Sequence, residues 1–156
     1  MKTIDVSLED YELEEYACEL NDENISSEDL EANVFGYVNS LEEENWRNYL
    51  TSYSKGHLIT KVLSEIRKLN KKNPKNSNIG LIRNLYVSEE LRNLGIGYQL
   101  MNECISEMLC YTNTIILISD GDEDNSFNLT KWYEDLGFKS LEVASTSPLM
   151  ILSVIS

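Results

Sequence analysis

Two periodicities of apolar residues run through the chain, and their succession predicts a series of strands and helices. Runs rich in β-branched and aromatic residues predict strands at residues 2–8, 33–38, 79–87, 114–119, 138–144 and 148–154. Apolar residues three and four positions apart predict helices at residues 10–20, 42–53, 57–72, 92–110 and 125–136, with a short helix starting at residues 26–28. Because strands and helices alternate from residue 79 onward, we expect an α/β arrangement in which helix 92–110 joins a parallel pair of strands.

The pattern is less regular in the first half of the chain. Gly36 interrupts the β-rich run of residues 33–38, and a glycine inside a strand weakens it. The helix predicted at residues 57–72 carries apolar side chains on one face and basic side chains on the other. Residues 71–78, with the sequence KKNPKNSN, have the composition of a turn or loop.

Length and composition narrow the class of protein. A chain of 156 residues suits one domain with a real core. No stretch approaches the roughly 20 apolar residues that cross a bilayer, and the first residues do not resemble a signal peptide. Three cysteines, none in Cys-x-x-Cys spacing, and one histidine argue against a zinc site. We therefore expect a cytoplasmic protein with reduced thiols and no metal, in which Cys104 and Cys110 are core material on helix 92–110.

The net charge of −14 comes from the N-terminal third of the chain. Residues 1–46 hold 15 acidic side chains and one base, which leaves 12 acids and 12 bases for residues 47–156. Such an acidic region repels nucleic acid and attracts cations, polyamines or basic peptides. It is equally consistent with a solvated surface that keeps the protein soluble.

Residues 79–98 contain the most informative motif of the chain. A strand is followed by a short turn and by Arg92-x-x-Gly95-x-Gly97, which opens the helix predicted at residues 92–110. The first N–H groups of a helix have no partner within it and lie at the positive end of its dipole. With the charge of Arg92 beside them, they form a site suited to a pyrophosphate. Alternatively, the glycines only permit a tight bend.

A second motif, WYEDLGF, occupies residues 132–138. Gly137 is expected to end a helix in the left-handed conformation, and Tyr133 lies one turn before it. Tyr133 is then either a general acid toward a departing thiolate or an aromatic that packs the helix on the sheet. The acidic run at residues 120–124 reads as an exposed loop, although carboxylates at the end of a strand also serve as a general base or as metal ligands.

Together, these motifs resemble the C-terminal half of the GNAT superfamily of acyl-CoA-dependent N-acetyltransferases, over residues 79–154. The resemblance implies a mixed, mostly antiparallel sheet whose central parallel pair splays where acetyl-CoA enters, with helices on both faces. It implies that Tyr133 protonates the departing CoA thiolate. The strand part of the implied acetyl-CoA site consists of Leu85, Tyr86 and Val87, of which Leu85 and Val87 flank the thioester and pantetheine. The pyrophosphate part consists of Arg92, Asn93, Leu94, Gly95, Ile96, Gly97 and Tyr98.

The chain departs from this family in its N-terminal half, which is more helical than usual. Family members carry a hairpin before the motif strand, where residues 56–78 here predict a basic helix and a loop. Either the N-terminal sheet is reduced, or residues 33–38 and 57–63 supply strands. Arg83 and Asn84 stand in the motif strand where an acid could deprotonate an amine. The general base is therefore open among Asp120, His57, an N-terminal glutamate and a water. Ser126 stands where the family commonly has an asparagine, with Asn125 beside it.

The sequence thus predicts one domain over residues 1–156, with an acidic, divergent acceptor-side half at residues 1–78 and an acetyl-CoA-binding half at residues 79–154. The predicted activity is direct transfer of an acetyl group from acetyl-CoA to a primary amine of a cationic small molecule or basic protein. The alternative is an inactive GNAT-fold binding or inhibitor protein that acts on a basic partner through its acidic region. We expect neither nucleic acid nor membrane as a partner, and a homodimer is left open.

Overall fold

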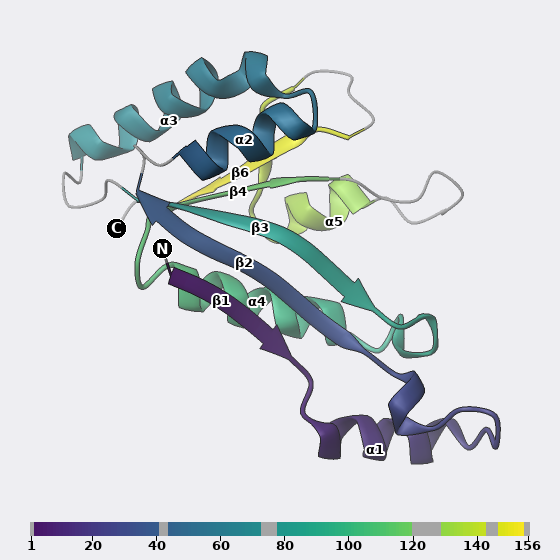
Figure 1. The fold of residues 1–156 in the computed structure, drawn as a ribbon. Helices are drawn as coiled ribbons and strands as arrows, with labels where there is room; N and C mark the ends of the chain where they lie inside the picture. The colour runs from purple at the N-terminus through teal and green to yellow at the C-terminus, as the bar shows by residue number, and fades with distance from the viewer. Residues whose placement is uncertain (1, 41–43, 73–77, 120–128, 143–146, 155–156) are drawn as a thin grey trace.

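The computed structural model describes residues 2–40, 44–72, 78–119, 129–142 and 147–154, apart from the side chains of residues 45 and 69–72. Within these residues, six strands form one sheet in the order β1-β2-β3-β4-β6-β5 (Figure 1). Their bounds are β1 Lys2–Ser7, β2 Ala32–Ser40, β3 Asn78–Val87, β4 Thr114–Ile118, β5 Lys139–Ser140 and β6 Leu149–Ser153. All neighbouring strands are antiparallel except the parallel pair β3 and β4. The mixed, mostly antiparallel sheet with a central parallel pair is therefore confirmed.

Helices cover both faces of this sheet, as predicted (Figure 1). The α-helices are α1 Asp10–Leu20, α2 Glu44–Ser52, α3 Ile59–Lys72, α4 Ile96–Met108 and α5 Leu129–Asp135. Single 3₁₀ turns are η1 Ser27–Asp29, η2 Gly56–Leu58 and η3 Glu89–Leu91. None of the described helices is both long and apolar enough to span a membrane.

The sheet separates two hydrophobic cores. The larger core lies between the sheet and α4, where Leu100, Met101 and Met108 pack on Ile4 and Val34. The smaller core lies between the sheet and helices α2 and α3, and contains Trp46, Leu50, Val62, Ile66 and Ile116. Strand β4 is buried along its whole length because both of its faces are covered.

The structure decides the open question about the N-terminal half. Residues 33–38 lie within β2, so Gly36 does not prevent a strand there. Residues 57–63 are helical, since they lie in η2 and α3. Strands β2 and β3 pair in antiparallel fashion, and two helices connect them where the family would have a hairpin.

Two predicted boundaries and one predicted burial were wrong. The helix expected to start at residue 92 starts at Ile96, because residues 89–91 form η3 and Arg92 is extended. Within the described part of residues 138–144, only the two residues of β5 are in a strand. Cys104 is buried in the core, whereas Cys110 is exposed and follows α4. The loop expected at residues 71–78, the acidic run and residues 125 and 126 lie wholly or mostly outside the described residues.

Candidate functional site

Strands β3 and β4 separate shortly after they meet. Their parallel register contains only the pairs Gly80↔Ile115 and Leu81↔Ile116, although β3 continues to Val87 and β4 to Ile118 (Figure 1). Beyond Leu81, β3 pairs with β2 alone. Because successive backbone groups of a strand point to opposite edges, alternate N–H and C=O groups of β3 then face the opening. This confirms the predicted splay.

A β-bulge lies at the start of the splay. In the register of β2 and β3, Phe35 is opposite Asn84 and Gly36 is opposite Ile82, which leaves Arg83 without a partner. An extra residue of this kind changes the alternation of side chains along a strand. Consequently Ile82 belongs to the core beneath α4, whereas Arg83 faces α2 and its neighbour Asn84 shares a face with Phe35.

The start of α4 offers unpaired N–H groups. Gly95 is the N-cap residue with φ +80°, and the first hydrogen bond of the helix runs from the Gln99 N–H to its carbonyl at 3.1 Å. No backbone acceptor lies within reach of the N–H groups of Ile96, Gly97 and Tyr98 among the described residues. The first turn contains no acid, and a Cβ at Gly95 would meet no atom within 4 Å. These features fit an anionic group at the helix N-terminus.

The predicted acetyl-CoA residues lie at the end of β3, in the turn that follows it and at the start of α4. Arg92 donates from Nε to the Val87 carbonyl oxygen at 3.1 Å, which ties the turn before α4 to the end of β3. Ile96 is buried and anchors the helix, whereas Leu94 and Tyr98 are about half exposed. The remaining members are Leu85, half-buried on the core, and Tyr86 and Asn93, both exposed.

The two sequence motifs meet at the start of α4. A Cβ placed on Gly97 would lie 3.7 Å from the Trp132 ring. Tyr133, next to Trp132 on α5, is only 6% exposed and packs edge to face on Trp132 and Phe138. Gly137 has φ +107°, which confirms the predicted left-handed end of this helix.

The buried position of Tyr133 has an electrostatic consequence. Burial disfavours the phenolate and raises the pKa of Tyr133 to about 12. The phenol therefore keeps its proton at neutral pH. The packing role weighed in the sequence analysis is confirmed by these contacts, whereas the role of Tyr133 as an acid stays a prediction.

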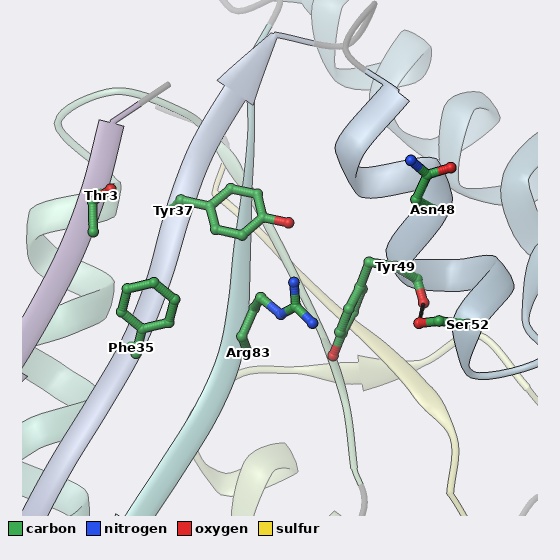
Figure 2. Close-up of a pocket in the computed structure, with 7 residues that line it drawn as sticks. All are labelled: Thr3, Phe35, Tyr37, Asn48, Tyr49, Ser52 and Arg83. Carbon is green, nitrogen blue, oxygen red and sulfur yellow. Dashed lines mark hydrogen bonds between the residues drawn. The ribbon is translucent and has the colours of Figure 1, made fainter.

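A cavity that the sequence analysis missed opens on the other face of the sheet (Figure 2). It has a volume of about 520 Å³ and is lined by Thr3, Phe35, Tyr37, Asn48, Tyr49, Ser52 and Arg83. These residues come from β1, β2, α2 and β3. The sequence signal for it was the polar pair Arg83-Asn84 inside an otherwise apolar strand.

Tyr49 connects this cavity with the end of β4. Its side chain is buried, and the Arg83 guanidinium carbon lies 5.1 Å from the centroid of its ring. Burial raises the pKa of Tyr49 well above its ordinary value, although a backbone hydrogen bond from Ile118 and the charge of Arg83 act in the opposite direction. Tyr49 is therefore a neutral phenol beside the splay.

Of the candidate bases, His57 is exposed and does not line the cavity. It lies near Glu142, which is ion-paired with Lys55 at 2.7 Å. Asp120 lies outside the described residues. The general base therefore stays open.

Comparisons with known proteins agree with this geometry. A family model described as "Acetyltransferase (GNAT) domain" matches residues 54–140. The solved structure of NAA60 from Arabidopsis thaliana, in complex with a bisubstrate analogue, gives a TM-score of 0.51 at 13% identity, over 98% of this chain and 99% of that chain. Arylalkylamine N-acetyltransferase 2 from Aedes aegypti gives a TM-score of 0.50 at 15% identity, over 78% and 67% of the two chains.

A Pyrococcus horikoshii protein matches with a TM-score of 0.46 at 17% identity, over 82% of this chain and 66% of its own length. No curated protein matches the sequence significantly. At these identities, the solved structures show a common fold alone. The family match covers more than half of the sequence, and on that ground this chain belongs to the GNAT family of acetyltransferases.

Proposed function

We propose that this protein is an acetyl-CoA-dependent N-acetyltransferase that moves the acetyl group directly to a primary amine. The observation that carries the proposal is the splay of β3 and β4, which ends at the open N-terminus of α4. A strand edge with unpaired backbone groups suits an amide-containing arm, and a helix N-terminus suits a pyrophosphate. Both lie within residues 54–140, which the family model matches.

In this proposal, the pyrophosphate of acetyl-CoA binds the N–H groups of residues 95–98, with Arg92 adding charge. The pantetheine arm lies along the open edge of β3 at Leu85, Tyr86 and Val87. Gly95 leaves room for the phosphates, since a Cβ at this position would project into open space. Ile96 holds the helix in the core and so fixes the direction of its N–H groups.

The transfer itself forms one bond and breaks one bond. The neutral amine attacks the thioester carbonyl carbon, and N–H groups on the open edge of β3 stabilise the resulting oxyanion. The tetrahedral intermediate then collapses, the C–S bond breaks, and the amine proton passes to a base or to water. Holding both reactants in position can supply on the order of 7–11 kcal/mol of the rate gain.

Tyr133 is the proposed donor to the departing thiolate. Its phenol holds its proton at neutral pH because burial raises its pKa to about 12. A thiol has an ordinary pKa of about 8.5, so the phenol assists chiefly by donating a hydrogen bond as negative charge develops on sulfur. A proton that it delivers is replaced from solvent.

The acceptor is an amine, and the chain offers two indications of its kind. The acidic residues 1–46 favour a cationic molecule or a basic protein through long-range attraction. Among solved structures of the same fold, one is an arylalkylamine N-acetyltransferase by name. The second indication is the lining of the cavity beside Tyr49, in which the described residues include no carboxylate.

The lack of a carboxylate among the described lining residues also favours a second candidate function, a GNAT-fold protein that binds acetyl-CoA or a basic partner without transfer. Incubation of the protein with acetyl-CoA and a panel of primary amines separates the two, with free thiol and acetylated amine as readouts. We expect equal amounts of thiol and acetylated amine. Binding of acetyl-CoA with no thiol release for any amine would support the binding protein instead.

A further inference from the structure

The cavity beside Tyr49 has an unusual balance of charge for an acceptor site in an acidic protein. Among the described residues, its lining contains one charged side chain, Arg83, and no aspartate or glutamate. Three of the other lining residues are aromatic, namely Phe35, Tyr37 and Tyr49. Aromatic walls hold flat or apolar groups, whereas the guanidinium of Arg83, an exposed residue at the wall of the cavity, attracts anions and repels cations.

Arg83 has no acidic partner among the residues that the structure describes. The ion pairs found among the described residues involve Lys55, Lys68 and Lys139, and none includes Arg83. Its contact is with the Tyr49 ring, 5.1 Å from the centroid. Figure 2 shows the guanidinium group between Tyr37 and Tyr49, directed into the cavity. Stacking on an aromatic face fixes the plane of a guanidinium and leaves its N–H groups available to a planar or tetrahedral oxyanion.

The cavity also lies where an acceptor would have to be. Arg83 is two residues beyond Leu81, the last residue of β3 that pairs with β4. Tyr49 receives a hydrogen bond from the backbone of Ile118, at the end of β4. A molecule in the cavity therefore adjoins the opening between the two strands, from the face opposite α4.

The acidic region does not contradict this placement. Thr3 lines the cavity, whereas the acidic helix α1 follows the opposite end of β1 (Figure 1). Asp5 is exposed on β1 opposite Phe35, but it is not part of the lining. Glutamates on α1 thus attract a cationic molecule from a distance, whereas Arg83 selects for the group that binds in the cavity.

We propose that the acceptor carries an oxyanion, a carboxylate or a phosphate, in addition to its amine, and that Arg83 binds this oxyanion within the cavity. The aromatic side chains line the cavity where the part of the molecule that connects the two groups would lie. A volume of about 520 Å³ suits a molecule of the size of an amino acid, a dipeptide or an amino-sugar phosphate. This inference rests on the proposed function, since it assigns the acceptor class of the same site.

Two matched pairs of amines test the inference. Phenylalanine and phenethylamine differ by a carboxylate, and glucosamine 6-phosphate and glucosamine differ by a phosphate. In at least one pair, we expect kcat/KM of the oxyanion-bearing member to be higher by about tenfold to a hundredfold, as for a hydrogen-bonded charged group. The pair that shows the difference identifies the oxyanion. Spermidine, a purely cationic amine, should be a poor acceptor.

Variants of Arg83 connect this preference to the cavity. In Arg83→Gln, the ratio of kcat/KM for the oxyanion-bearing amine to kcat/KM for its matched partner should fall close to one. Arg83→Lys should retain part of the preference because the charge remains. Arg67→Gln, at an exposed arginine on α3, is the matched control and should leave the preference unchanged. The inference would be overturned if the wild-type protein acetylated the amines without an oxyanion equally well or better. It would also be overturned if the preference survived in Arg83→Gln.

A binding measurement keeps the inference testable if no amine is acetylated. Calorimetric titration of the same four amines into the protein with CoA present should show tighter binding of the oxyanion-bearing member in at least one pair. Absent or equal binding of the oxyanion-bearing members would refute the inference. Failure of the proposed function has a different signature. In that case acetyl-CoA itself does not bind, or no thiol is released with any amine.

Discussion

The Arg83 guanidinium packs on the ring of Tyr49, with 5.1 Å between its carbon and the ring centroid. Arg83 is the unpaired residue of the bulge in β3, and Tyr49 belongs to α2. A hydrogen bond with Ile118 holds the Tyr49 hydroxyl at the end of β4. The contact therefore links the three elements around the opening of the sheet.

Two substitutions of Tyr49 separate its ring from its hydroxyl. Tyr49→Phe keeps the ring beneath Arg83 and loses the hydrogen bond with Ile118, so we expect a loss of about 1 kcal/mol in the free energy of unfolding and little change in KM for the acceptor. Tyr49→Leu also removes the aromatic face and should raise this KM several-fold. Steady-state kinetics and urea unfolding measure both effects. Equal KM values in the two variants would contradict a role of the ring in orienting Arg83.

Replacing Tyr133 by phenylalanine tests the proposed donor. Tyr133→Phe removes the hydroxyl but keeps the packing on Trp132 and Phe138. We expect kcat to fall by about 10²–10⁴-fold, as for loss of a general acid, with affinity for acetyl-CoA nearly unchanged. Because the pKa of Tyr133 is about 12, the wild-type rate should show no loss from its ionisation below pH 10. An unchanged kcat in the variant would remove Tyr133 as the donor.

Gly36 has a steric role at the bulge. A Cβ at this position would overlap the Leu81 carbonyl oxygen and lie 2.5 Å from the terminal methyl group of Met108. Since the backbone of β3 cannot move away freely, Gly36→Ala should destabilise the fold by about 1–3 kcal/mol. Gly56→Ala is the matched control, because its Cβ would meet nothing closer than Thr51 Oγ1 at 3.5 Å. Urea unfolding that gives equal stability for the two variants would disagree with the described packing.

Glu142 gives the fold a dependence on acidic pH. Burial alone raises the pKa of Glu142, but hydrogen bonds from Lys55 and from the Leu149 N–H, with the charge of Lys55, lower it below 4.5. A carboxyl group whose pKa is lower in the folded state stabilises the protein above the unfolded pKa. That contribution is lost as the pH falls through the folded pKa.

The corresponding variant is Glu142→Gln, which we expect to cost about 2 kcal/mol at neutral pH and progressively less below pH 4.5. Both side chains of the Lys55–Glu142 pair are only 12% exposed, so solvent screens the pair weakly. The control is Glu65→Gln, whose partners Lys68 and Lys139 are mostly exposed, and which should cost less than about 1 kcal/mol. Thermal unfolding followed over this pH range would refute the account if the two variants behaved alike.

Local chemistry explains which parts of the structure could be predicted from the sequence. The strand, turn and glycine-capped helix of residues 79–108 were predicted because glycine positions and apolar spacing act within a few residues. The same holds for Gly137, whose left-handed conformation ends α5. Even there, the start of the helix was placed four residues early, since η3 and the extended Arg92 precede it.

The bulge and the cavity could not be predicted in the same way. Arg83 lacks a partner only because β2 and β3 pair in a particular register, and two helices lie between these strands in the sequence. Thr3, Tyr37 and Tyr49 come together from three elements whose contacts are all non-local. Taken alone, each of these side chains is ordinary for its strand or helix, so no local pattern indicates that they line one cavity.

Calorimetric titration with acetyl-CoA tests the central claim, that the open end of β3 and the start of α4 hold this co-substrate. The wild-type protein should bind one acetyl-CoA per chain. Gly95→Val should weaken binding by about tenfold or more, because a β-branched residue is strained at φ +80° and its side chain would enter the space left for the phosphates. Arg67→Gln should bind like the wild type. Absence of binding to the wild-type protein, or full affinity in Gly95→Val, would contradict the account.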